Sequence, residues 1–467
     1  MRQTFLIGFG AKPVLSLFME ACLNGSNYRL VRALMNLLCI SNGHGEDVIA
    51  LRILTALRQL EPSLQLSALP ISGTGRIYAR AGTHADIPLI GPAQTLPSGG
   101  FLNQDPKQLV RDIGGGLISL TRSQLSALKT WTQTGDHILA VGDIVPLLFA
   151  YRSGLPYHFI GTAKSEYWLR DEQGKLPPSK LWDRLEGWSG SVYLPWERWL
   201  MSRPRCRSAF VRDALTAQRL RTLGVSAIYA GNPMMDGLDP AGKLADVVAG
   251  SDLVIGLIPG SRPPEAYENW ARMMTSVPAV VETFVDQRLV FLGAIAPALD
   301  LEKLGNSIAN AWTISPNDKS PALYSTYQHP TYQHPTYQYP TYQYKNAQLI
   351  LTTDAYNDCL AESDIAIATA GTATEQFVGL GKPAITLPGQ GPQFTQSFAT
   401  VQAKMLGPSV QIVNQATDVG DAIADILSNP ERRQQIAKNG EQRMGTPGAD
   451  KRIAVKLLDA MNNKLLN

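Results

Sequence analysis

The sequence predicts an α/β fold in which two Rossmann-like domains face a central cleft. Short apolar runs rich in Val and Ile recur along the chain, and each leads through a turn of small residues into a helical pattern. Such runs are typical of buried parallel strands, and their alternation with helices is typical of βαβ units. The units fall into two sets, separated by a polar, glycine-containing stretch. With 467 residues, the chain is long enough for two such domains.

The expected domain boundaries follow from these two sets. We assign residues 35–236 to a first α/β domain and residues 237–250 to an inter-domain linker. Residues 251–430 form the second α/β domain. Residues 431–467 are expected to be helical, and we expect the last of these helices to pack back on the first domain.

Two segments do not fit the α/β pattern. Residues 1–34 have an apolar start, but Lys12 and Glu20 interrupt it and no clear cleavage site follows. We expect Met35 to be the natural start, with a weakly ordered N-terminal arm as the alternative. From Thr326 the chain repeats Thr-Tyr-Gln-His/Tyr-Pro, and a proline at every fifth residue forbids a helix or a central strand. We therefore expect an extended, disordered insert at 324–344.

Composition and charge exclude several classes of function. Charged residues make up only 17% of the chain and the net charge is +3, which argues against a nucleic-acid partner. The four cysteines lie far apart, as expected in a reducing compartment, and form no disulfide or zinc-binding set. No apolar run reaches the ~18 residues that span a bilayer. We expect a cytoplasmic protein, with a peripheral position at the inner face of the membrane as the alternative.

The first strand of the first domain, residues 35–40, ends in a glycine-containing loop. A helical pattern starts at Val48, so the loop lies at the carboxyl edge of the expected sheet, where open α/β folds bind ligands. Another strand, residues 137–142, ends at the same edge in Asp143. Glycine-containing turns occur in many α/β proteins, so the loop alone indicates binding only weakly. Its candidate residues are Ser41, Asn42, Gly43, His44, Gly45 and Glu46.

The second domain contains two loops that suit a phosphate. The strand at 253–258 leads into Gly260, Ser261 and Arg262, and the strand at 364–369 leads into a turn of small residues and a helix. Small residues let backbone N–H groups at a helix start approach a phosphate, and the helix dipole favours its charge. An ordinary tight turn is the alternative. The candidates in the second loop are Gly371, Thr372, Ala373, Thr374 and Glu375, where Glu375 can accept hydrogen bonds from ribose hydroxyls.

A stretch of the first domain between Lys164 and Arg212 interleaves tryptophans with arginines. Such a mixture is found where proteins lie at a membrane interface. A solvated arm with its rings tucked against the domain is the alternative. The residues are Trp168, Trp182, Trp188, Trp196, Trp199, Arg198, Arg203, Arg205 and Arg207.

Several of these segments together resemble the lipid-A-disaccharide synthases. The resemblance is carried by residues 257–262 with Glu265, by the turns at 370–375 and 231–236, and by the segment that starts at Val141. It covers most of residues 35–461 and is more specific in the second domain. The loop at 41–47 takes the place of the family's first glycine-rich loop, and its sequence resembles most the cyanobacterial group related to these synthases. The family's acidic run after the first-domain strand is only partly kept, because Leu147, Leu148 and Phe149 replace its second acid and the neighbours of that acid.

The resemblance implies a GT-B glycosyltransferase with an acceptor-side first domain and a nucleotide-sugar-binding second domain. It would move a sugar from a UDP-sugar, its substrate, to a lipid-linked or amphiphilic acceptor, with inversion and without a cofactor. The chain has no Asp-x-Asp pair to hold a metal, so Arg262 is expected to bind phosphate oxygens instead. Gln393 and Gln396 are candidates for sugar or phosphate contacts. A UDP-sugar epimerase or hydrolase, and a non-catalytic nucleotide-sugar-binding protein, remain alternatives, and no oligomeric state follows from the sequence.

The general base of such a reaction has two main candidates, with Glu46 and Asp47 of the first loop behind them. Asp143 corresponds approximately to the family's catalytic acid. His44 lies in the first glycine-containing loop, and an unperturbed histidine has a pKa near 6.5, which suits a general base. Each also has a structural explanation, since Asp143 can cap the following helix and His44 can orient its loop.

Overall fold

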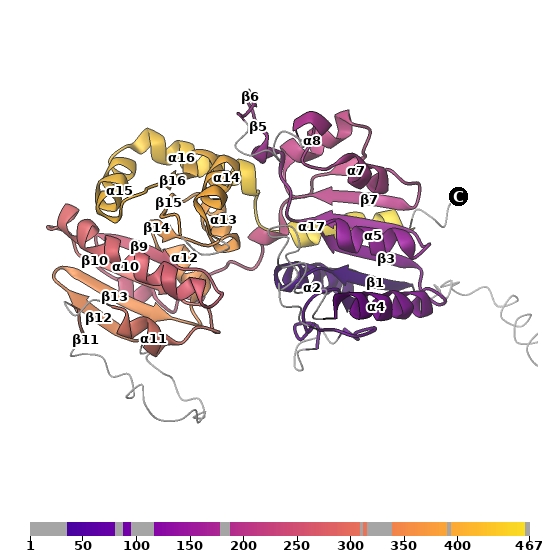
Figure 1. The fold of residues 1–467 in the computed structure, drawn as a ribbon, viewed down its shortest axis with the longest axis horizontal. Coiled ribbons are helices and arrows are strands. Elements are labelled where there is room, and N and C mark those ends of the chain that lie inside the picture. The colour runs from indigo at the N-terminus through magenta and orange to yellow at the C-terminus, as the bar shows by residue number, and fades with distance from the viewer. Residues whose placement is uncertain are drawn as a thin grey trace, which may run out of the picture.

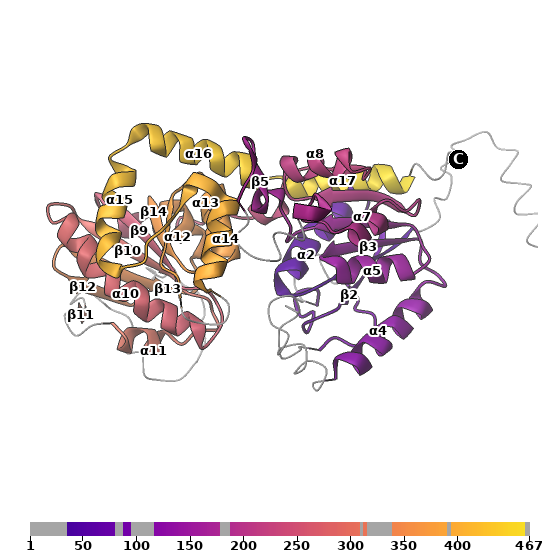
Figure 2. The ribbon, with the colours of Figure 1, turned by 45° about the horizontal axis from the view of Figure 1, so that its top comes forward.

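The computed structural model describes residues 35–79, 87–94, 116–177, 187–308, 312–314, 339–389 and 394–462. They form two α/β domains that lie side by side (Figures 1 and 2). The segment 1–34 and residues 324–338 of the expected insert lie outside the described residues. Within the described residues, no helix combines the length and the apolar composition that a membrane crossing requires.

The first domain is built on a sheet that is parallel throughout, with six strands among the described residues. Of the helices that the structure describes, α2 (His44–Leu60) and α17 (Ala449–Asn462) cover one face, and four others cover the opposite face. Those four are α4 (Leu117–Trp131), α5 (Ile144–Arg152), α7 (Pro195–Met201) and α8 (Ala214–Thr222). In spatial order the strands are β2 (Gln65–Pro70), β1 (Asn36–Ser41), β3 (His137–Gly142), β4 (Tyr157–Gly161), β7 (Cys206–Val211) and β8 (Ala227–Ile228).

The second domain has a larger sheet, with eight strands among the described residues. Its spatial order is β11 (Thr313–Ile314), β12 (Thr341–Tyr344), β13 (Ala347–Thr352), β10 (Leu289–Ala294), β9 (Leu253–Ile258), β14 (Ile365–Ala368), β15 (Ala384–Thr386) and β16 (Val410–Ile412). The strands from β13 to β16 are parallel, and β11 and β12 are antiparallel additions. One face carries α10 (Glu265–Thr283), α11 (Leu301–Asn306) and α15 (Val419–Leu427). The other face carries α12 (Tyr356–Glu362), α13 (Thr372–Gly379) and α14 (Gln396–Leu406).

The order of the strands creates a switch point in each sheet. In the first domain the chain moves from β1 to β2 on one side and returns to β3 on the other. In the second domain it moves from β9 to β10 on one side, and β14 then pairs with β9 on the other. Open parallel sheets bind ligands at the carboxyl ends of the strands that flank such a point. The topology therefore marks the loops after β1 and β3, and those after β9 and β14, as the candidate sites.

The expectation of a disordered insert at 324–344 is wrong for its last residues, 341–344. The last copy of the repeat forms β12 (Thr341–Tyr344), which pairs with β11 and β13. This copy lacks the proline of the others, so its backbone N–H groups are free to pair in a sheet. Tyr344 also stacks near Trp312, with ring centroids 5.3 Å apart.

The last helix, α17, lies on the first domain although it follows the second domain in sequence (Figure 1). Ile453, Leu457 and Met461 are buried against the same core as α2. The crossing is held by Asp236, whose carboxylate accepts hydrogen bonds from the backbone N–H groups of Gly448, Ala449 and Asp450 at 2.5, 3.1 and 2.8 Å. The turn at 231–236 therefore anchors the return of the chain.

The segment 237–250 connects β8 to β9 but is not an irregular linker throughout. It contains the short helix α9 (Ala245–Val248), and Leu244 is fully buried in the core of the second domain. The carboxylate of Asp358 accepts the backbone N–H groups of Ala241 and Lys243 at 3.3 and 2.7 Å. A burial of this kind ties the segment to the second domain.

Candidate functional site

The two phosphate-type loops of the second domain lie side by side. Ile258, the last residue of β9, is paired with Ala368, the last residue of β14. The side chain of Asn269 in α10 bridges the loops that follow, donating to the carbonyl oxygens of Pro259 at 3.1 Å and Thr369 at 3.4 Å. Gly260 has a φ of 95°, which favours glycine, and a Cβ there would lie 3.6 Å from the carbonyl oxygen of Thr369.

The N-terminus of α13 begins after a glycine. Gly371 at the cap position has no side chain, so it does not cap the N–H groups of the first turn. The amide of Gln402 in α14 holds the turn below by donating to the carbonyl oxygens of Ala370 at 3.0 Å and Gly371 at 3.1 Å. The hydroxyl of Thr374 donates to Ala370 at 2.6 Å and is buried. Thr374 therefore supports the turn from inside, while Thr372 is exposed and Ala373 is partly exposed.

Of the two glutamine candidates, the structure describes only Gln396. Gln396 is exposed in the first turn of α14, the helix whose Gln402 holds the α13 turn, and the ring of Phe398 lies 3.8 Å from the position of a Cβ at Gly371. This end of α14 therefore lies over the phosphate-type turn. Gln393 lies outside the described residues.

Arg262 is exposed at the start of the β9–α10 connection, beside the exposed Ser261. Its charge interacts with Glu265 of its own domain and with Glu46 of the first domain. The carboxylate of Glu265 also accepts the backbone N–H of Phe394 at 2.6 Å. Arg262 is thus a cation of the second domain whose charge acts on the loop at the first switch point.

Glu375 makes an ion pair across the domains that the sequence did not predict. Its Oε2 lies 2.8 Å from Nη2 of Arg212, the residue that follows β7, and only 3% of the Arg212 side chain is exposed. Arg212 also donates to the carbonyl oxygen of Thr162 at 3.4 Å. The only available signal in the sequence was an arginine directly after a strand, at the edge where ligands bind.

The first-domain loop divides into structural and accessible residues. Ser41 is fully buried, where its hydroxyl donates to Asp47 at 2.5 Å and lies 2.8 Å from the hydroxyl of Tyr78. Gly43 has a φ of 114° and is the residue that precedes α2, while a side chain at Gly45 would meet nothing within 4 Å. Ser41 therefore supports the loop rather than facing a substrate.

Asp143 occupies the position of a helix cap. Its Oδ1 accepts the backbone N–H of Val145 at 2.9 Å and the side-chain amide of Asn42 at 3.0 Å. Burial raises the pKa of Asp143, while these hydrogen bonds and the charge of Lys164 oppose the rise. Both loops at the first switch point are thus joined through Asn42 and Asp143. The side chain of His44 lies outside the described part of the chain, so its place relative to Asp143 stays a prediction.

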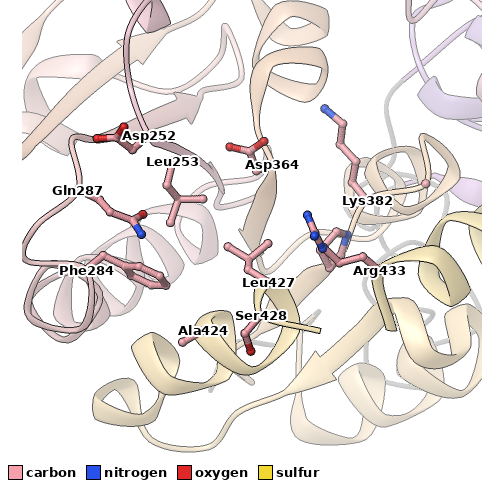
Figure 3. A pocket seen from close by; sticks show the side chains of 12 residues that line it. Asp252, Leu253, Phe284, Gln287, Asp364, Lys382, Ala424, Leu427, Ser428 and Arg433 are labelled. Carbon is pink, nitrogen blue, oxygen red and sulfur yellow. The ribbon is translucent and has the colours of Figure 1, made fainter. Parts of the chain in front are cut away.

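A separate pocket of about 640 Å³ lies at the opposite edge of the second sheet (Figure 3). Asp252, Asp364 and Pro383 line it, and each directly precedes a strand. None of the candidate residues described above lines this pocket. The candidate site therefore lies at the other end of the strands, between the two domains.

Solved structures with the same architecture confirm the expected GT-B fold. A UDP-N-acetylglucosamine 2-epimerase from Neisseria meningitidis, bound to UDP-N-acetylglucosamine, matches 91% of this chain and 100% of its own with a TM-score of 0.52 and 14% identity. MurG from Acinetobacter baumannii matches 91% and 99% with a TM-score of 0.50 and 15% identity. A UDP-glucose:anthocyanidin 3-O-glucosyltransferase in complex with UDP matches 92% and 99% with a TM-score of 0.53 and 12% identity. No protein-family model and no curated protein matches the chain in sequence.

Proposed function

We propose that the protein is a glycosyltransferase that moves a sugar from a UDP-sugar to a lipid-linked or amphiphilic acceptor, with inversion and without a metal, similar to the lipid-A-disaccharide synthases. The observation that carries the proposal is the pairing of the Gly260–Arg262 and Gly371–Glu375 loops at the switch point of the second sheet. The resemblance in sequence falls on these same two loops. Two of the solved structures that share the fold contain UDP or UDP-N-acetylglucosamine.

In this proposal the second domain stabilises the departing diphosphate. The N–H groups at the start of α13 and the guanidinium of Arg262 supply donors and positive potential for phosphate oxygens. The carboxylate of Glu375, which Arg212 orients through the ion pair, accepts hydrogen bonds from the ribose hydroxyls. Because these groups are fixed before the reaction, they stabilise the charge that develops on the leaving group.

An exposed patch on the first domain supports a lipid-linked acceptor. Trp188, Trp196 and Trp199 are exposed by 81%, 53% and 46%, and Leu148 of the neighbouring helix α5 is exposed as well. Trp199 packs edge-on against Tyr151, and the guanidiniums of Arg203 and Arg205 lie over these two rings. Aromatic rings with arginines around them suit a surface of anionic lipid. We call these seven residues the Trp/Arg patch.

The protein is expected to bind vesicles that contain phosphatidylglycerol more tightly than vesicles of phosphatidylcholine alone. Replacing Trp196 and Trp199 together with serine should weaken the binding by about tenfold or more, because binding scales with the apolar area that enters the interface. Co-sedimentation measures this effect. Val285→Ser is the matched control, since Val285 is an exposed apolar residue of the second domain. Equal binding by both variants would contradict a lipid-facing patch.

UDP is expected to stabilise the intact protein against heat, because a ligand that binds only the folded state shifts unfolding by mass action. A thermal shift titration with UDP, with CMP as the matched control, tests this directly. Absence of a UDP-dependent shift would rule out the proposed donor site.

A UDP-sugar epimerase or hydrolase is the second candidate. Two carboxylates, Glu46 and Asp143, interact at the first switch point, and such a pair also suits proton transfers on a bound sugar. Structures of UDP-N-acetylglucosamine 2-epimerases share the fold to the same degree as the transferases. Incubation with UDP-N-acetylglucosamine and no acceptor separates the two, since only an epimerase or hydrolase converts it at a substantial rate. A non-catalytic nucleotide-sugar-binding protein would bind UDP and would convert no UDP-sugar, with or without an acceptor.

A further inference from the structure

Glu46 lies where three strands of the first sheet end. It is in the first turn of α2, after β1, and its Oε1 lies 3.5 Å from the hydroxyl of Thr162, which follows β4. Gly142, the last residue of β3, packs directly against it, since a Cβ at Gly142 would lie 3.3 Å from Cγ of Glu46. The φ of 132° at Gly142 likewise favours glycine. Contacts with residues at the ends of β3 and β4 therefore hold this carboxylate beside the switch point.

The charges around Glu46 come from both domains. Asp47 of the same helix and Asp143 at the start of α5 are the acidic neighbours, and Arg262 of the second domain is the basic one. Lys164, after β4, acts on Asp143. The pKa of Glu46 is raised to about 7: burial is the main cause, the charges of Asp143 and Asp47 add to it, and hydrogen bonds from its own backbone and from Thr162 oppose the rise. A carboxylate with such a pKa can take a proton near neutral pH and is strong enough as a base to hold it.

Asp143 is less suited to the same task. Its Oδ1 already accepts two hydrogen bonds, from Asn42 and from the N–H of Val145. Hydrogen bonds to a carboxylate favour its ionised form and hold it in one orientation. Burial nevertheless raises the pKa of Asp143 itself, and in its ionised form Asp143 raises the pKa of Glu46.

We propose that Glu46 is the general base of the transfer reaction, a role that rests on the function proposed above. An oxygen lone pair of the acceptor hydroxyl forms the new bond to the anomeric carbon, and the bond from that carbon to the diphosphate oxygen breaks. Its electron pair leaves with UDP, beside Arg262. The hydroxyl proton passes to the carboxylate of Glu46, which becomes a neutral acid. Asp143 is a positioning residue in this scheme.

The test uses the full chain with a panel of UDP-N-acetylglucosamine, UDP-glucose and UDP-galactose, vesicles of bacterial lipid extract as acceptor, and UDP release as readout. Glu46→Gln is expected to lower kcat by about 100- to 10,000-fold and to keep the thermal shift by UDP, which also shows that the variant folds. In the wild type, kcat/KM should fall on the acidic side of a pKa near 7. Asp143→Asn should keep an acidic limb but move it to lower pH, because the like charge that raises the pKa of Glu46 is gone.

The outcomes separate the two proposals. If the wild type turns over a UDP-sugar and Glu46→Gln shows the same rate and the same acidic limb, Glu46 is not the general base. The proposal of a glycosyltransferase would be unaffected by that result. UDP binding without turnover of any UDP-sugar would overturn both. Loss of the acidic limb in Glu46→Gln, with slow residual turnover, supports the base, since a purely structural role of Glu46 would change the rate without changing the pH profile.

Discussion

Replacing Glu375 with alanine is expected to lower the free energy of unfolding by about 3–5 kcal/mol and to weaken UDP binding in the same variant. The pair with Arg212 is nearly buried, with 12% of the Glu375 side chain and 3% of the Arg212 side chain exposed. Loss of the carboxylate leaves a buried guanidinium without its ion-pair partner, although the charge of the neighbouring Asp213 still acts on it. The Nε of this guanidinium already has no hydrogen-bond partner among the described residues. Urea denaturation and UDP titration measure the two effects.

A double variant separates the two roles of Glu375. In Arg212→Met with Glu375→Leu, the two charges of the pair are replaced together by apolar groups of similar size, so part of the lost stability should return. The buried Asp213 keeps its place but loses the favourable charge of Arg212. UDP binding should not return, because no carboxylate is left to receive the ribose. If the double variant bound UDP as the wild type does, Glu375 would serve only to hold the domains together. If Glu375→Ala changed stability by less than about 0.5 kcal/mol, the interdomain pair would be irrelevant to folding.

The loops of the second domain could be predicted because their placement depends on local order alone. A strand followed by Gly260 and another followed by Gly371 must both end at the carboxyl edge of a parallel sheet. That β9 and β14 are also neighbours follows from the usual strand order of such folds. The hydrophobic pattern and the chemistry of the side chains point to the same edge of the sheet, so the sequence alone predicts these loops as a candidate site.

The interdomain contacts could not be predicted in the same way. Arg212 and Glu375 are 163 residues apart, and nothing in either local pattern specifies the other. The same holds for Asp236, which was matched to a family turn but whose carboxylate caps α17 more than 200 residues later. Whether a polar residue faces a ligand or its own protein depends on such long-range packing, as Ser41 shows. The prediction of a disordered repeat failed at its last copy for a different reason. That copy lacks the proline that keeps the other copies from pairing in a sheet.

Replacing Arg262 with alanine is expected to weaken UDP binding by about 10- to 100-fold and to abolish most of the thermal shift at a fixed UDP concentration. Arg262 is an exposed residue, and ion pairs of exposed residues contribute little, so its loss should lower the free energy of unfolding by no more than about 1 kcal/mol. Arg262→Lys should give an intermediate affinity, because lysine keeps the charge but not the paired donors that match a phosphate. Isothermal titration with UDP measures all three proteins.

The matched control for Arg262 is Arg288→Ala. Arg288 is 71% exposed and directly precedes β10, so it lies at the opposite edge of the same sheet. Both substitutions remove one positive charge from the second domain, so a general loss of positive potential would weaken UDP binding in both. A selective effect at Arg262 instead means that the β9–α10 loop contacts the diphosphate. Since Arg262 also interacts with Glu46, the same loop then brings the leaving group next to the carboxylate that takes the acceptor proton. If Arg262→Ala bound UDP with wild-type affinity, the diphosphate would not contact this loop. The proposed placement of the leaving group next to Glu46 would then be wrong.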